Sequence, residues 1–143
     1  MKGFLVDTNV VSEARKGERA DQRVLSWIGA NRDELYLSVL VTGEIRRGIE
    51  SIRRRDAAAA ASLEGWLRDV ETTFEERILP VDAAVADRWG RLMAVRTLPV
   101  VDGLLAATAL VHGLTLATRN LRDVARAGVS AVDPFAHGAR GRR

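Results

Sequence analysis

Short apolar runs alternate along the chain with longer stretches in which apolar residues recur every three or four positions. The first pattern is typical of buried strands and the second of amphipathic helices. We predict strands over residues 4–6, 35–38, 78–81 and 114–118, with an edge strand over 129–132. We predict helices from residue 8 or 9 onward and over residues 21–31, 39–54, 57–76, 83–98, 102–112 and 120–127.

This alternation of strands and helices indicates how the sheet is built. Strands separated by helices favour parallel pairing, because each helix carries the chain back to the start of the next strand. We therefore expect an α/β sandwich with a central, mostly parallel sheet of four to five strands flanked by helices. We also expect one domain over residues 1–136 and a flexible basic tail over 137–143.

The composition excludes several classes of chemistry. The 143 residues include no cysteine and only two histidines, His112 and His137. A disulfide scaffold, a thiolate zinc site, a cysteine nucleophile and a multi-histidine metal site are therefore excluded. No apolar run approaches the ~20 residues that a membrane helix needs. Asp7 also interrupts the N-terminus too early for a signal peptide, so we expect a cytoplasmic protein with no membrane partner.

The basic residues are almost all arginine. Lys2 and Lys16 are the only lysines among 22 basic residues, and the net charge is +3. Arginine suits nucleic acid or an acidic partner, but the same bias also follows from a GC-rich genome. One basic cluster includes Arg46 and Arg47. It is either a solvated face or a surface that binds the phosphates of an RNA substrate.

Four acidic residues and one amide lie near the predicted junctions between strands and helices. These residues are Asp7, Glu44, Asp102, Asn120 and Asp123. In parallel sheets, sites form at the carboxyl ends of the strands, near the point where the strand order reverses. We expect the five side chains to meet in one crevice there.

Each of these residues also has a purely local explanation. Asp7 and Asp102 can each cap the helix that follows. Asn120 and Asp123 have the spacing of a capping box, and Asp123 is three residues before Arg126. Glu44 can pair with an arginine three residues later or face solvent.

As a group, the acidic residues favour a metal site. Carboxylates gathered in one crevice repel one another and raise each other's pKa unless a cation neutralises them. Oxygen ligands without cysteine or histidine select Mg²⁺ or Mn²⁺. Divalent ions held in this way are the usual apparatus for hydrolysing phosphodiesters.

Four sequence motifs resemble those of the PIN-domain family, especially VapC-type toxins and their FitB-like branch. They are Val-Asp-Thr-Asn-Val from residue 6, Leu-Ser at 37 with Glu-Ile at 44 and Gly48, Asp-Gly-Leu-Leu-Ala-Ala-Thr-Ala from 102, and Leu-Ala-Thr-Arg-Asn-Leu-Arg-Asp from 116. They cover nearly the whole chain in the family's order and spacing. Each motif is short, and the four together are specific.

The resemblance implies a PIN-like three-layer sandwich and a Mg²⁺-dependent endoribonuclease toxin, with Mn²⁺ as a possible substitute. It also implies a homodimer and neutralisation by a VapB-like antitoxin. Asp7, Glu44 and Asp102 match the family's acidic metal positions. Many members have aspartate where this chain has Asn120, and Asp123 lies nearby.

Further roles and partners follow from the same comparison. We expect Asn120 and Asp123 to complete the catalytic site, with Thr8 and Thr118 hydrogen-bonded to its carboxylates. The antitoxin is expected to insert a basic side chain among these acids. Apolar residues that a small sheet cannot cover further favour the dimer, and these are Ile45, Ile49, Trp66 and Leu67.

Two other functions are weighed against this one. A phosphatase with Asp7 as nucleophile needs a second acid two residues later, and this chain has Asn9 there. A catalytically degenerate PIN-like module that binds RNA without cutting it is the other alternative, because Asn120 replaces an acid.

Overall fold

The computed structural model describes residues 3–137, in which five strands form one parallel sheet. The strands are β1 (Phe4–Val6), β2 (Leu35–Ser38), β3 (Ile78–Leu79), β4 (Thr115–Ala117) and β5 (Ala131–Val132). Their order across the sheet is β3-β2-β1-β4-β5, and every neighbouring pair is parallel. The chain builds outward from β1 to β3 and then crosses to the other side of β1. The strand order therefore reverses between β1 and β4, where a crevice is expected.

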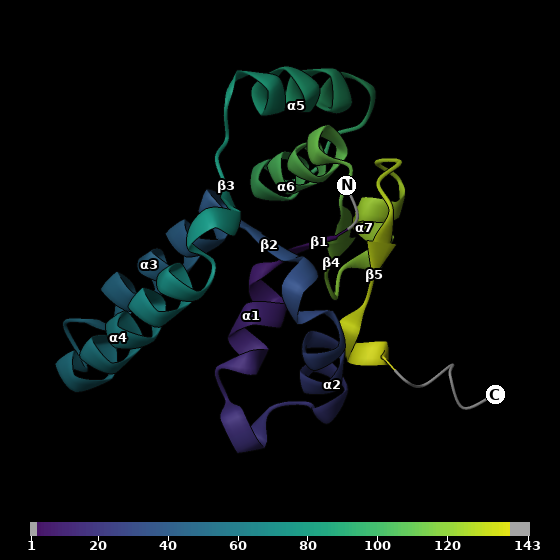
Figure 1. Cartoon of the computed structure of the whole chain (residues 1–143). Helices are drawn as coiled ribbons and strands as arrows, with labels where there is room; N and C mark the ends of the chain where they lie inside the picture. The colour runs from purple at the N-terminus through teal and green to yellow at the C-terminus, as the bar shows by residue number, and fades with distance from the viewer. Residues whose placement is uncertain (1–2, 138–143) are drawn as a thin grey trace.

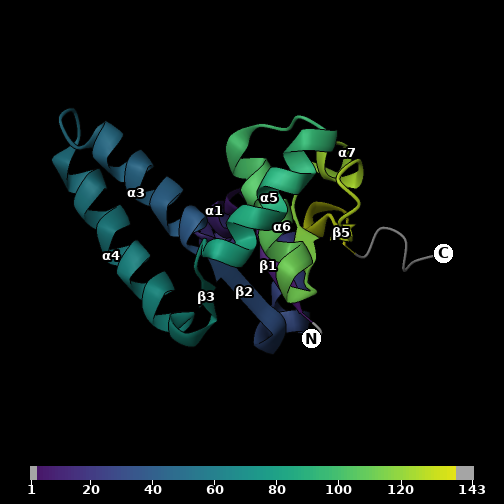
Figure 2. The same cartoon turned by 90° about the horizontal axis from the view of Figure 1, so that it is seen from above.

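Helices cover both faces of this sheet and complete three layers (Figure 1). The helices are α1 (Thr8–Ala14), α2 (Gln22–Asn31), α3 (Val39–Ile52), α4 (Ala57–Thr73), α5 (Ala83–Val95), α6 (Val100–His112) and α7 (Leu121–Ala125). α5 and α6 lie on one side of the sheet, and α1 and α2 lie on the other. α3 and α4 form a hairpin that projects away from the sheet (Figure 2). The predicted α/β sandwich is confirmed.

α6 is the central helix of the core because its sequence is almost entirely small or apolar. Leu105, Ala106 and Ala109 are buried, and the helix contacts β1 and β4. Gly103 lies directly beneath the Trp89 indole of α5, and a Cβ there would come within 3.1 Å of Trp89 Nε1. α6 ends as predicted at Gly113, which adopts a left-handed conformation with φ 67°.

The predicted element bounds need correction at several ends. α6 begins at Val100, with Pro99 at its N-cap, so Asp102 lies in the first turn and does not cap the helix. α5 ends at Val95, because the next residues take an extended path toward Pro99 and bury Leu98. β3 stops at Leu79, before Pro80, which has no backbone N–H for the ladder.

The apolar residues expected to be left uncovered and to favour a dimer are mostly buried, so that expectation about their exposure is wrong. Ile45, Ile49 and Leu67 are only 7%, 1% and 2% exposed. These side chains are covered inside the chain, because α3 and α4 pack against each other and close their apolar faces. Trp66 is half-buried at the edge of the same cluster.

Two other expectations concern the ends of the chain and the membrane. Apart from His137, the expected basic tail lies outside the described residues. Among residues 3–137 no single helix is long and apolar enough to cross a membrane. α5 and α6 reach that length only when taken together across a bend of 119°.

Candidate active site

Asp7 lies where β1 ends and α1 begins, in the middle of the sheet. Its Oδ1 accepts a hydrogen bond from the backbone N–H of Thr8 at 2.7 Å, so it caps α1 as its sequence position suggested. Its Oδ2 accepts a hydrogen bond from the Thr118 hydroxyl at 2.8 Å. Asp7 therefore has a structural role at the helix end, and its second oxygen is held toward β4.

Glu44, in α3, contacts Thr8, the residue next to Asp7. It lies one and a half turns into α3, and its Oε1 accepts a hydrogen bond from the Thr8 hydroxyl at 2.5 Å. Its partner is thus a threonine of α1, and no ion pair with Arg47 is found in residues 3–137. Thr8 accordingly holds Glu44 beside Asp7, as expected from the sequence.

Asp102 joins these two carboxylates from the first turn of α6. The side chain is half-buried, and within residues 3–137 it has no hydrogen-bond partner. Burial raises the pKa of Asp102, and the charges of Asp7, Asp123 and Glu44 raise it further. Asp102 therefore lies within electrostatic range of the other three predicted acids.

Asp7 has the same kind of environment. Burial raises its pKa, the Glu44 charge adds to the increase, and the hydrogen bonds from Thr118 and Thr8 oppose it. Burial and neighbouring acids therefore disfavour the ionised forms of Asp7 and Asp102, and a bound cation would relieve this cost.

The segment after β4 holds the remaining predicted site residues. Thr118 is fully buried, and its hydroxyl accepts a hydrogen bond from the backbone N–H of Asn120 at 3.1 Å. The Asn120 side chain makes no capping hydrogen bond to α7, so the capping-box explanation is not supported. Asp123 is exposed on α7 and forms no ion pair with Arg126 in the described part of the chain.

Asn9 is a site residue that the sequence reasoning missed. Its amide nitrogen lies 3.5 Å from Asp7 Oδ2 and 3.4 Å from the Thr118 hydroxyl. Its carbonyl oxygen accepts a hydrogen bond from the Arg119 backbone N–H at 3.4 Å. Asn9 therefore ties α1 to the segment that carries Asn120. The available signal was its position two residues after Asp7, which places it in the first turn of α1.

The two arginines predicted to contact substrate differ in their surroundings. Arg46 forms ion pairs with Glu50 at 3.2 Å and with Glu64 of α4 at 3.5 Å. Arg47 is exposed, and together with Glu44 it lines an open cavity of about 350 Å³. Of these two arginines, Arg47 is the one that forms no ion pair within residues 3–137.

Comparison with known proteins identifies the architecture. The chain matches the family profile of the PIN domain over residues 4–129. This chain belongs to the PIN domain family.

The relatives of this PIN domain span its length. It is 34% identical to a protein named VapC ribonuclease Y4jK of Sinorhizobium fredii, over 92% of this chain and 97% of that protein. It is 30% identical to toxin FitB of Neisseria gonorrhoeae, over 92% of this chain and 98% of FitB. A solved structure of FitAcB from N. gonorrhoeae superposes with a TM-score of 0.84 at 29% identity, covering 92% and 98% of the two chains. The resemblance to VapC- and FitB-type toxins is confirmed.

The donor set of this PIN domain fits a hard divalent cation. Oxygen ligands from carboxylates, with burial and like charge opposing their ionisation, are the environment that Mg²⁺ or Mn²⁺ relieves. In residues 3–137 no three acidic or histidine side chains converge on one point to hold an ion. Magnesium usually takes only one or two carboxylates and completes its shell with water and substrate phosphates. The residues therefore fit a partly hydrated ion, and the expected three-carboxylate ligand set is not preformed.

Proposed function

We propose that this PIN domain is a Mg²⁺- or Mn²⁺-dependent endoribonuclease toxin. The observation that carries the proposal is the group of four acids at the reversal of strand order, in which Asp7 and Asp102 have raised pKa values. A crevice of uncompensated carboxylates attracts a divalent cation, and a phosphodiester supplies the oxygens that complete its shell. The names of the relatives, VapC ribonuclease and toxin FitB, support the same activity.

Each side chain has a role that follows from its contacts. Asp7 and Asp102 would be the principal ligands of the ion, and Glu44 would assist through the oxygen that Thr8 does not hold. A bound Mg²⁺ or Mn²⁺ supplies a water of lowered pKa and positive charge for the scissile phosphate. Thr118 fixes the orientation of the Asp7 carboxylate. Asn120 and Asp123 follow β4, and their amide and carboxylate groups would help to position a water beside the ion.

A cleavage assay with and without metal tests this function. We expect a pool of cellular RNA to be cut in Mg²⁺ or Mn²⁺ and to remain intact in EDTA, and Asp102→Asn to abolish the cutting. RNA that is bound equally well with and without metal, and never cut, would instead establish the degenerate binding module. A covalent phosphate trapped on Asp7 would instead support the alternative of a phosphatase with Asp7 as nucleophile. The phosphatase is disfavoured, since Asn9 donates to Asp7 and cannot serve as the second acid.

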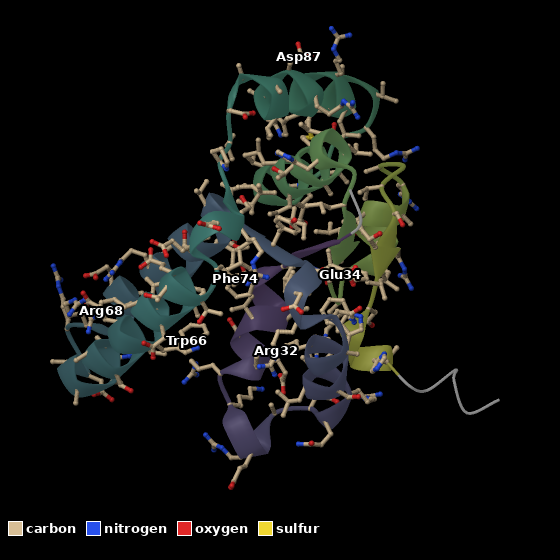
Figure 3. The ribbon with its side chains drawn as sticks, in the orientation of Figure 1. Arg32, Glu34, Trp66, Arg68, Phe74 and Asp87 are labelled. Atoms are coloured by element: carbon tan, nitrogen blue, oxygen red, sulfur yellow. The ribbon has the colours of Figure 1, made fainter. Side chains whose placement is uncertain are left out.

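An antitoxin is the second part of the proposal. Solved complexes such as a toxin–antitoxin complex from Klebsiella pneumoniae share this fold, with a TM-score of 0.71. In this chain an apolar cavity of about 240 Å³ lies between α1, α2 and α4, and its lining includes Val11, Ile28, Trp66 and Phe74. Trp66 and Phe74 lie on the side of α4 that faces α1 (Figure 3).

A second cavity, also of about 240 Å³, reaches Glu44 of the acidic site. It shares Trp66 with the first cavity, and its lining includes Thr8, Arg15 and Glu44. A partner segment with an apolar face and a basic end fits both cavities, because its guanidinium or ammonium group can pair with the carboxylates. We propose that a VapB-like antitoxin binds in this way and covers the crevice.

Co-expression with the product of the neighbouring reading frame tests the antitoxin. We expect a stable complex that no longer cuts RNA, and we expect Trp66→Ala to weaken it. Replacing every Arg and Lys in the partner's C-terminal segment should restore cleavage. Inhibition that survives those replacements would rule out a basic side chain among the carboxylates.

The homodimer stays a prediction, now with a different motive. Val95 and Val100, at the end of α5 and the start of α6, are 85% and 59% exposed. A second copy covering these residues would remove apolar surface from water. Light scattering at tens of micromolar, the range of modest dimers, should show a dimer, and Val100→Asp should give a monomer.

A further inference from the structure

α3 presents three faces with different surroundings. Its apolar face packs into the core through Val41, Ile45 and Ile49. A second face carries the ion pairs: Arg53 lies 2.7 Å from Glu50 and 2.6 Å from Glu64 of α4. Arg46 joins the same pairs. The positive charges on this second face are therefore neutralised by their own neighbours.

The third face begins at the acidic site and runs to the end of the hairpin. At 3.6 residues per turn, Glu44, Gly48 and Ser51 fall along one stripe, with Arg47 beside it. Arg54 and Arg55 follow in the turn that joins α3 to α4. We call Arg47, Arg54 and Arg55 the basic stripe. All three are exposed, and within residues 3–137 none of them forms an ion pair.

Small residues leave an open trough along this stripe. Glu44, Arg47, Gly48 and Ser51 line the open cavity of about 350 Å³. A Cβ built on Gly48 would meet nothing within 4 Å, so the space above this residue is free. The Ser51 hydroxyl is used within the helix, where it donates to the Gly48 carbonyl at 2.7 Å. The positive charge in the lining of the trough therefore comes from Arg47.

We infer that the basic stripe binds the phosphates of the RNA strand that leads away from the cleavage crevice toward the hairpin tip. The inference rests on the proposed function and adds a substrate subsite to it. An arginine guanidinium pairs with two phosphate oxygens at once, and the stripe has no carboxylate partner to compete. Glu50 and Glu64 hold Arg46 and Arg53, so those two residues are not part of the subsite.

The stripe offers more than one phosphate contact. Arg47 lies in α3, and Arg54 and Arg55 lie in the turn beyond the end of that helix at Ile52. The three guanidinium groups are therefore spread from the cleavage crevice toward the hairpin tip, where successive phosphates of one RNA strand can reach them.

Salt dependence of RNA binding tests the subsite with a matched control on the same helix. The test variant is Arg47→Gln with Arg54→Gln, and the control is Arg46→Gln with Arg53→Gln. Both lower the net charge by two. Binding of labelled RNA of two and six nucleotides is measured in EDTA, so that nothing is cut.

Each lost phosphate contact lowers the slope of log K against log salt by about 0.7 for single strands. For the six-nucleotide RNA, the affinity ratio of wild type to test variant should therefore shrink about sevenfold between about 50 and 200 mM salt. The control's ratio should change by less than about twofold over that range. The test variant should also lose most of the affinity gained by lengthening the RNA from two to six nucleotides.

Four outcomes would overturn the inference. Equal changes in slope for both double variants would mean a general effect of net charge. If the test variant has the same slope as a wild type that cuts RNA, the stripe is not a phosphate subsite and the proposed function stays intact. A test variant that loses the antitoxin and keeps RNA would assign the stripe to a protein partner. A wild type that neither binds RNA in EDTA nor cuts it in Mg²⁺ would overturn the proposed function as well.

Discussion

The molecule contains two groups of carboxylates with opposite environments. On the α3–α4 hairpin, hydrogen bonds from Arg53 lower the pKa of Glu50 to about 2 and also lower that of Glu64. At the end of β1 and the start of α6, burial and neighbouring acids raise the pKa of Asp7 and Asp102. The same type of side chain is stabilised as an anion in one place and destabilised as an anion in the other.

The difference lies in where the compensating cation comes from. The hairpin carries its own arginines, so the charges of its acids are neutralised, and the resulting ion pairs join the two helices. In the crevice, Asp7 and Glu44 are held by threonine hydroxyls and a backbone N–H, which orient a carboxylate but bring no positive charge. A group of anions kept in place without a counter-ion is prepared for a cation from outside.

The largest expected effect is that of Asp7→Asn. The change should abolish RNA cleavage and leave the protein folded, because asparagine can still cap α1. In EDTA the variant should melt at a higher temperature than wild type, since one of several repelling charges is gone. Wild type should gain about 2.7 kcal/mol when free Mg²⁺ is a hundredfold above its dissociation constant, and the variant much less.

Thermal melts in EDTA and in Mg²⁺, beside a cleavage assay, check this prediction. Unfolding of Asp7→Asn would make Asp7 a structural residue only. Equal shifts of both proteins by Mg²⁺ would show that Asp7 is not a principal ligand.

Thr8→Val is expected to have the next largest effect. Valine keeps the shape of the side chain but removes the hydroxyl that holds Glu44. Losing such an orienting contact typically costs 10- to 100-fold in metal affinity or activity. Thr42→Val is the matched control, because the Thr42 hydroxyl only bonds its own helix at Val39. Similar activity of the two variants would mean that Glu44 needs no support from Thr8.

The pH dependence of Asp102→Asn is a smaller effect that probes the repulsion itself. Because the folded pKa of Asp102 is raised, its ionised form destabilises the folded state above that pKa, and protonation relieves the cost as pH falls. In EDTA the variant should therefore melt above wild type at pH 7. The difference should disappear as the pH falls through the raised pKa toward 3.8, the ordinary value. A difference in melting temperature that does not change with pH would contradict this origin.

Arg53→Gln should have the smallest effect. The pairs of Arg53 with Glu50 and Glu64 are exposed, and exposed pairs contribute little because water screens them. We expect cleavage as in wild type and only a slight change in melting temperature at pH 7. A loss of cleavage comparable to that of Thr8→Val would show that the hairpin pairs do more than join two helices.

Most of the site could be located from the sequence, because at Asp7 the pattern that marks a helix cap also marks the carboxyl edge of the sheet. An aspartate directly after a buried strand is both a helix cap and a residue at the carboxyl edge, and Asp7 is both. Glu44 was harder to place, since helical spacing cannot show whether a glutamate meets solvent, an arginine or a hydroxyl. Asn9 was missed because its three partners come from Asp7 and from residues more than a hundred positions away.

The sequence by itself determined the alternation of strands and helices, the parallel sheet and the acids that lie at its edge. These follow from hydrophobic spacing and helix-end chemistry, which act over a few residues. Tertiary structure alone decided that Ile45, Ile49 and Leu67 are covered by the α3–α4 hairpin, and that Arg46 is paired whereas Arg47 is free. It also decided that Thr8 of α1 holds Glu44 of α3 and that Thr118, after β4, holds Asp7. The physical reason is that burial and charge compensation depend on neighbours in space, and local sequence patterns do not specify which distant elements will meet.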